Sequence, residues 1–137
     1  VNPYRFRGDM RKSHALVSVA GPLSNLVLAM VAAVPFRLGW LSLYGGTSII
    51  SMPGILMQFI SINLALMVFN LIPFPPLDGS RVLAWLLPRQ WALKLERLEQ
   101  FGGPGLMLGL YLLSRLGILG LIMNPLMNFM FRALLVY

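Results

Sequence analysis

A long uncharged stretch that ends in a proline-rich segment constrains the fold of this chain more than any other feature. No charged residue occurs between positions 38 and 77, and the next charge, Asp78, follows three prolines and precedes Gly79. Prolines remove backbone donors and interrupt helices, so the segment leading to Asp78 is not a regular helix. Within the membrane, a non-helical backbone segment or a carboxylate occurs where protein covers it or where it lines a water-filled cavity. Asp78 is therefore a candidate functional residue; the alternative is that it caps a helix that starts at Ser80.

The composition indicates a membrane protein. Of the 137 residues, 58% are hydrophobic and 11% are charged, whereas a soluble domain carries about 25% charged residues. The 11 Lys and Arg residues outnumber the 4 acidic residues, but they flank apolar segments, and this placement argues against nucleic-acid binding. The sequence has no cysteine, which excludes disulfides and thiolate metal ligands. It starts at Val1, and we expect it to be a fragment that lacks its natural N-terminus.

Hydropathy predicts an all-α membrane protein with a single transmembrane domain over residues 1–137. Two apolar segments, 14–36 and 49–72, are each long enough for a membrane helix. We expect Gly21-Pro22 to break or kink the first span, and the prolines before Asp78 to break the second. Residues 102–123 are the third predicted span, although Arg115 lies near its middle; the alternative is a hairpin of short segments that turns between 115 and 120. The apolar residues 124–137 allow a fourth span.

Residues 80–101 differ from the spans because charged and apolar residues alternate there. Trp91, Leu95 and Leu98 fall on one helix face, which predicts an amphipathic helix on the membrane surface; a solvated connecting loop is the alternative. Residues 1–12 and 80–101 hold four basic residues each, whereas the loop between the first two spans holds only Arg37. Two crossings separate the basic segments, so both lie on one side, which the positive-inside rule makes cytoplasmic.

Two motifs resemble those of a known family. The run that ends the second span resembles the Asn-Pro-Asp-Gly signature of the site-2 protease family of intramembrane zinc metalloproteases: Asn70-Leu71-Ile72-Pro73-Phe74-Pro75-Pro76-Leu77-Asp78-Gly79. The first span carries a stretch similar to that family's second motif, a Gly-Pro turn with Asn three residues after the proline: Ala20-Gly21-Pro22-Leu23-Ser24-Asn25. Residues 1–7 are similar to the loop that precedes this span in many bacterial members. The resemblance covers nearly the whole chain, and the motifs occur in the family's order.

The resemblance implies a zinc metalloprotease of a bacterial-type cell membrane that cleaves transmembrane proteins within the lipid bilayer. In this family two histidines of an H-E-x-x-H helix and the aspartate of the Asp-Gly motif hold the zinc, and the glutamate is the general base. Asp78 is then the third zinc ligand, and Gly79 is expected to adopt a backbone angle closed to other residues. Asn25 binds substrate or the oxyanion, or else packs against a neighbouring helix. Asn70 orients the Asp78 carboxylate or an unwound carbonyl.

The sequence departs from the family pattern because it contains no H-E-x-x-H. Its only histidine, His14, has no glutamate beside it and suits the membrane interface better than a metal site. We therefore expect the other two zinc ligands and the general base upstream of Val1, and we expect the 137-residue chain alone to be inactive. Two other functions stay open: a transporter or ion-binding subunit with a broken helix, and a non-catalytic membrane scaffold of the same fold.

Overall fold

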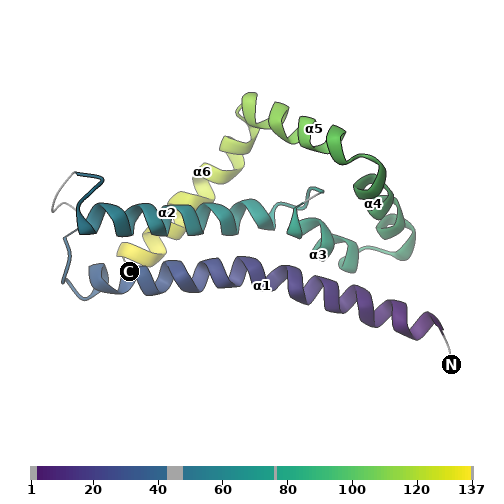
Figure 1. Ribbon diagram of the computed structural model, residues 1–137, viewed down its shortest axis with the longest axis horizontal. Helices are drawn as coiled ribbons and strands as arrows, with labels where there is room; N and C mark the ends of the chain where they lie inside the picture. Colours follow the sequence, from purple (N-terminus) through teal and green to yellow (C-terminus); the bar gives the residue numbers. More distant parts are fainter. Residues whose placement is uncertain (1–2, 43–47, 76, 137) are drawn as a thin grey trace.

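The computed structural model describes residues 3–42, 48–75 and 77–136, and in these ranges the chain forms helices and no strands (Figure 1). The helical elements of these ranges are α1 Pro3–Arg37, α2 Met52–Leu71, α3 Asp78–Leu86, α4 Arg89–Phe101, α5 Gly103–Arg115, α6 Ile118–Phe131 and the π-helical η1 Arg132–Val136. The prediction of an all-α protein is confirmed. Residues 1 and 2 of the predicted basic segment and Pro76 of the Asp-Gly motif lie outside the described residues.

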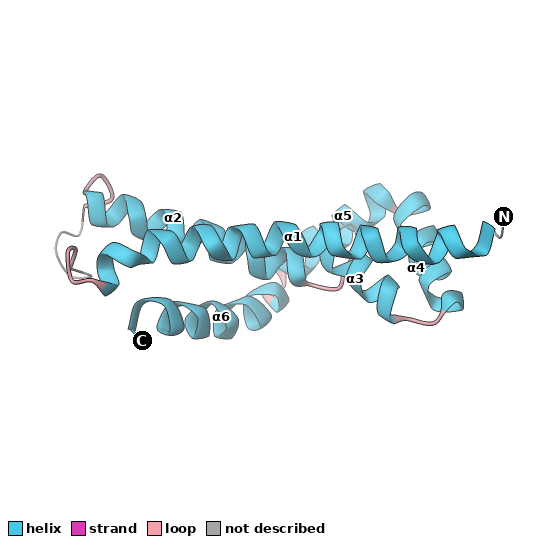
Figure 2. Cartoon of the chain, turned by 90° about the horizontal axis from the view of Figure 1, so that it is seen from below, coloured by secondary structure: helices cyan, strands magenta, loops and turns pink. Residues whose placement is uncertain are grey.

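The two longest helices, α1 and α2, lie side by side in opposite directions and contain the core (Figure 1, Figure 2). Ala29 and Ala33 of α1 pack in one cluster with Ile60 and Leu64 of α2, and each is at most 1% exposed. Alanine has a small side chain, so the two backbones can approach closely, as is common between membrane helices. The rest of both helices carries many exposed apolar side chains, which suits a bilayer better than water.

Three helical segments of the described chain are long and apolar enough to cross a membrane: Met10–Arg37, Met52–Leu71 and Ile118–Leu135. The first two agree with the predicted spans. The predicted span at residues 102–123 is wrong, and the alternative turn between 115 and 120 is correct, because α5 ends at Arg115. Gly117 then adopts a left-handed angle, φ +76°, and its amide donates to Ser114 O at 3.1 Å, which is a glycine-dependent way to end a helix.

The helix α5 is too short to cross the membrane by itself. With 13 residues it is about 20 Å long, whereas the hydrocarbon core of a bilayer is about 30 Å thick. The apolar residues after Gly117 belong to the third span, Ile118–Leu135. The predicted fourth span at 124–137 therefore forms the second half of the third one within the described residues.

An arginine at the end of α1 holds the third span against the helix pair. The Arg37 Nε donates to Leu134 O at 2.8 Å, and its Nη2 donates to Ala133 O at 2.9 Å. A cation at carbonyls that end a helix satisfies free acceptors and complements the helix dipole. Leu134 itself is 9% exposed and belongs to the core cluster, so this contact joins the C-terminal segment to the α1–α2 pair.

The helix α1 continues through Gly21-Pro22, so the predicted break at this position is wrong. Pro22 and Pro35 both lie inside the helix. Membrane helices tolerate internal proline where serine side chains or neighbouring helices support the local backbone. Here the Ser24 hydroxyl donates to Ala20 O at 2.7 Å, and Pro22 is buried.

The predicted single amphipathic helix at residues 80–101 is two helices, α3 and α4, joined at Leu87 and Pro88. A proline disfavours the helical angle in the residue before it, and Leu87 is extended, with φ −79° and ψ 152°. The chain therefore changes direction before α4 begins. The helix α3 lies beside the N-terminal half of α1, and α4 packs against α3 (Figure 1).

Candidate functional site

Asp78 is the first residue of α3, at the point where the chain resumes a helix after the proline-rich segment. The N-cap of α3 is Leu77, and no side chain caps this helix, so Asp78 does not have the capping role that was its structural alternative. The side chain is half-buried. It makes no hydrogen bond or ion pair with another residue in the described part of the chain. A carboxylate in this state is available for a ligand.

The Asp78 carboxylate lies against Gly21 of α1. A Cβ atom added to Gly21 would lie 3.6 Å from Asp78 Oδ2, which is van der Waals contact. The two motifs singled out in the sequence therefore meet in space, although they lie on different helices. Gly21 has no side chain, which leaves room for the carboxylate oxygen beside α1. Gly21 is exposed beside it, so this part of the α1 surface is open.

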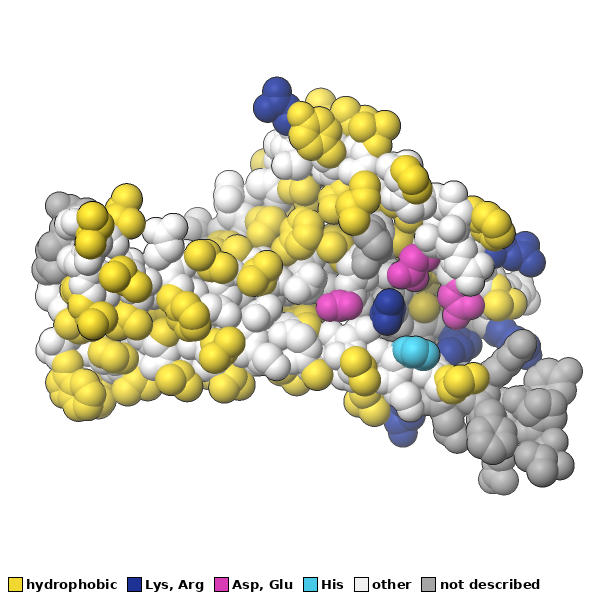
Figure 3. Space-filling model, viewed as in Figure 1, with side chains coloured by type: hydrophobic (Ala, Val, Ile, Leu, Met, Phe, Trp, Pro, Cys, Tyr) yellow, Lys and Arg dark blue, Asp and Glu magenta, His cyan; other side chains and the backbone are white. Residues whose placement is uncertain are grey.

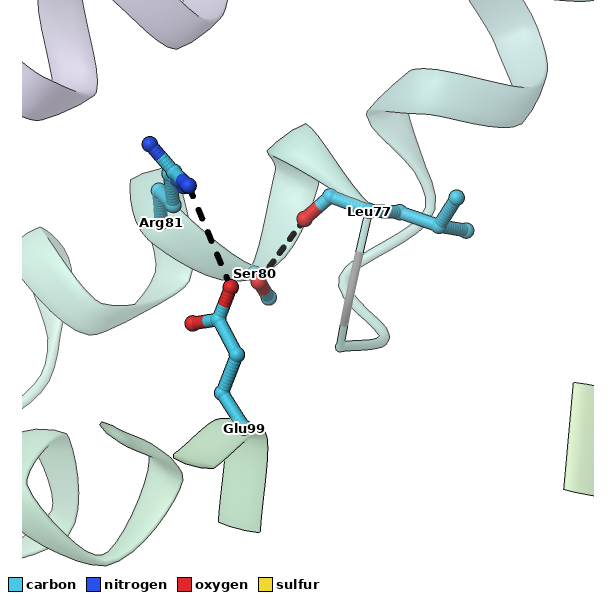
Figure 4. Close-up of polar contacts among 4 residues, drawn as sticks. All are labelled: Leu77, Ser80, Arg81 and Glu99. Atoms are coloured by element: carbon cyan, nitrogen blue, oxygen red, sulfur yellow. Dashed lines mark hydrogen bonds and ion pairs between the residues drawn. The ribbon is translucent and has the colours of Figure 1, made fainter. Parts of the chain in front are cut away.

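Gly79 is required by a close approach of the backbone. A Cβ atom there would overlap the carbonyl oxygen of Ile72 and lie 2.5 Å from Leu71 O, both at the end of α2. Its φ is not positive, so the expectation of a special backbone angle is wrong and steric room is the reason for glycine. The next residue, Ser80, is 1% exposed and its hydroxyl donates to Leu77 O at 2.7 Å (Figure 4). These contacts hold the turn that presents Asp78.

Gly79→Ala should destabilise the protein because the added methyl group overlaps two backbone carbonyls that cannot move independently. Overpacking of this kind costs about 1–3 kcal/mol. The expected result is a lower thermal transition of the purified protein in detergent. Gly103→Ala is the matched control, since nothing lies within 4 Å of a Cβ atom at that position. Equal losses in the two variants would contradict the steric role of Gly79.

The two candidate asparagines flank this site on α1 and α2. Asn25 lies four residues after Gly21, so the two share a face of α1, and Asn70 is in the last turn of α2. Both are half-buried, and within the described chain neither side chain hydrogen-bonds to Asp78 or to any other residue. By contrast, the buried Asn63 donates to Phe59 O at 2.8 Å and is satisfied within its own helix. The structure thus brings Gly21 close to Asp78, and the side-chain amides of Asn25 and Asn70 make no hydrogen bond with the described residues.

A groove of about 210 Å³ opens beside the site between α1, α3 and α4. Charged side chains of both signs gather on this face of the molecule (Figure 3). The groove is lined by Arg11, His14, Ser80, Arg81, Ala84, Trp85, Leu95, Glu96 and Glu99. Arg81 Nη2 lies 4.0 Å from Glu99 Oε1 (Figure 4). The arginine that follows Asp78 by one helical turn is therefore directed towards α4.

Sequence reasoning missed the role of Arg11, which it treated only as one cation of a basic segment. Arg11 Nη2 donates to the carbonyl oxygens of Ala84 and Leu87, at the C-terminal end of α3. This contact ties the helix that begins with Asp78 to α1. No sequence signal distinguishes Arg11 from the other basic residues near the start of the chain, because the contact depends on how α3 packs.

Asp78 offers one candidate ligand for a metal ion. The described residues hold no group of three or more His, Asp or Glu side chains that could bind a metal ion, whereas a catalytic zinc takes three protein ligands. His14 lines the groove with Glu96 and Glu99, and these three do not form such a group. The described residues do not form a complete zinc site, and no catalytic step can be derived from them alone.

The sequence is similar to two proteins named as putative zinc metalloproteases. The described chain is all-helical with three helices that suit a membrane. Over 102 residues, 72% of this chain, it is 40% identical to the Bacillus subtilis (strain 168) protein named "Putative zinc metalloprotease YwhC". Over 82 residues, 56% of this chain, it is 37% identical to the Methanocaldococcus jannaschii protein named "Putative zinc metalloprotease MJ0611".

These matches cover 46% and 36% of the two relatives, so the present chain spans less than half of either protein. No protein-family model matches the sequence, and no solved structure matches it. The similarity is therefore to proteins that carry the name of zinc metalloproteases and that are longer than this chain.

Proposed function

We propose that this chain forms part of the core of an intramembrane zinc metalloprotease of the site-2 type, in which Asp78 is a zinc ligand. The observation that carries the proposal is the close approach of the Asp78 carboxylate to Gly21. It brings together the two motifs that resemble the site-2 protease family. The names of the two relatives and the three candidate spans agree with this class.

Each residue of the site has a role in this proposal. Zinc, when bound, acts as a Lewis acid and activates water. Asp78 supplies one anionic oxygen ligand, and Gly21 leaves room beside it. Asn25 shares the helix face of Gly21 and donates from its amide to the substrate or to the oxyanion. Asn70 orients the Asp78 carboxylate or a free carbonyl at the end of α2. Transmembrane proteins are the substrates, and the lipid bilayer surrounds the site.

The remaining ligands and the general base come, in this proposal, from a part of the protein outside the present sequence. One carboxylate does not meet the three-ligand requirement of a catalytic zinc. We therefore propose that the 137-residue chain alone binds zinc weakly and does not cleave substrate. A transporter or scaffold with the same fold is the second candidate, and the close approach of Asp78 to Gly21 favours the protease because it joins both protease-like motifs.

Metal removal tests the proposal directly in the full-length protein. As purified in detergent, it should hold about one zinc per chain and cleave a model transmembrane substrate. A chelator should remove the zinc and the cleavage together, and added zinc should restore both. Cleavage that persists without metal would exclude a zinc protease. Ion transport without cleavage would select the transporter.

We also propose that the end of the molecule that holds α3 and α4 faces the cytoplasm. Arg11 of α1 and Arg81 of α3 line one groove together with residues of α4, so these three segments lie at the same end of the α1–α2 pair. In intact bacterial cells, an impermeant thiol reagent should label Ile50→Cys, which lies in an exposed turn, 86% accessible. Gln90→Cys, at the start of α4, should be labelled only after permeabilisation. The reverse pattern would invert the topology.

A further inference from the structure

The two acidic residues of α4 lie on one side of the helix, apart from Lys94 and Arg97. Its two acidic residues, Glu96 and Glu99, line the groove towards α1 and α3, and Glu99 pairs with Arg81. Ala92, on the same side of α4, is 2% exposed. The acidic side of α4 therefore faces the protein.

The opposite side of α4 combines large apolar residues with cations. Trp91, Lys94, Leu98 and Phe101 are all exposed and follow the i, i+3, i+7, i+10 spacing of a single helix face. We call these four residues and the adjacent, exposed Arg97 the outer face of α4. The Lys94 Nζ lies 4.6 Å from the centre of the Trp91 ring. None of the described acidic side chains, Asp78, Glu96 and Glu99, belongs to this face.

The apolar residues of this face need a partner. Phe101 is 85% exposed, Trp91 57% and Leu98 53%, which is costly in water. With 13 residues, α4 is about 20 Å long and does not span a bilayer. Tryptophan, phenylalanine and leucine beside lysine and arginine are typical of helices that lie in the plane of the membrane interface.

We infer that the outer face of α4 binds anionic phospholipids at the membrane surface. The charge complementarity carries the choice of partner, because Lys94 and Arg97 lie on the outer face while both glutamates of the helix lie on the side that lines the groove. Apolar residues of the face enter the acyl-chain boundary, and the two cations contact phosphate groups. This inference does not depend on zinc binding or on proteolysis.

Quenching of Trp91 fluorescence tests the inference in the full-length protein. Trp91 is first made the only tryptophan of the protein. This requires Trp40→Phe, Trp85→Phe and the replacement by phenylalanine of any tryptophan outside this sequence. The protein is placed in nanodiscs that mix phosphatidylglycerol with phosphatidylcholine, and bromine is attached to the acyl chains of one lipid or the other. At equal mole fractions, brominated phosphatidylglycerol should quench Trp91 at least about twofold more strongly, since each nearby cation favours an anionic lipid by about fivefold.

Two variants separate charge recognition from simple membrane contact. Lys94→Gln with Arg97→Gln should abolish the preference for phosphatidylglycerol while quenching by brominated phosphatidylcholine persists. Arg115→Gln with Arg132→Gln removes two cations elsewhere and should leave the preference intact. If neither brominated lipid quenched Trp91, protein would cover this face. If both quenched it equally, the face would have no preference for anionic lipid. Either result would overturn the inference. A preference that survives in the Lys94 and Arg97 variant would overturn the assignment to these two residues.

Discussion

Asp78→Ala in the full-length protein should abolish cleavage of a transmembrane substrate, with a loss of about 10⁴-fold or more, the scale of losing a catalytic group. The bound zinc should fall with it. The reason is that Asp78 has a half-buried carboxylate close to Gly21 that makes no hydrogen bond or ion pair with another described residue, and in our proposal it is one of three zinc ligands. An alanine leaves that position without a donor. Zinc content by atomic emission and cleavage of a model substrate are the two measurements.

Two further variants test whether the loss of activity is specific to the negative charge of Asp78. Asp78→Asn keeps the size of the side chain but lacks the negative charge, so it should be severely impaired as well. Glu96→Gln removes another carboxylate, from the groove beside the site, and should leave zinc content and activity near those of the unmodified protein. Full activity of Asp78→Ala would refute the ligand assignment.

Asn25→Ala should reduce turnover by about 10²–10³-fold, or about 2.7–4 kcal/mol, which is the effect of removing one donor to an oxyanion. Asn25 shares the helix face of Gly21, which lies close to the Asp78 carboxylate. Zinc content and thermal stability should stay near normal, because no hydrogen bond within the described chain is lost. Turnover in the full-length protein, measured together with the thermal transition, tests this expectation.

Asn63→Ala is the control for a packing role. Asn63 is 6% exposed and hydrogen-bonded to Phe59 O, so its replacement should affect stability through lost packing and leave the chemistry unchanged. If Asn25→Ala instead lost stability and activity in parallel, as a packing residue would, the catalytic role of Asn25 would be wrong.

Hydropathy predicted the first two spans because each is a continuous apolar segment between polar ones. It misplaced the third because residues 102–136 are apolar almost throughout, apart from Arg115 and Arg132, and such a stretch contains several windows long enough to cross a membrane. The boundary is decided by the left-handed turn at Gly117 and by the bonds from Arg37 to Ala133 O and Leu134 O. Those bonds join residues far apart in the chain, so no local pattern contains them.

The sequence by itself determined the helical membrane architecture and identified Asp78, Asn25 and Asn70 as candidates, because composition, hydropathy and motif order are properties of the chain alone. Only the tertiary structure decided that the Asp78 carboxylate lies close to Gly21, that Gly79 is needed for room against the end of α2, and that Arg81 is directed to Glu99. It also decided which side of α4 faces the protein. These are contacts between separate helices, and they follow from how the helices pack against one another.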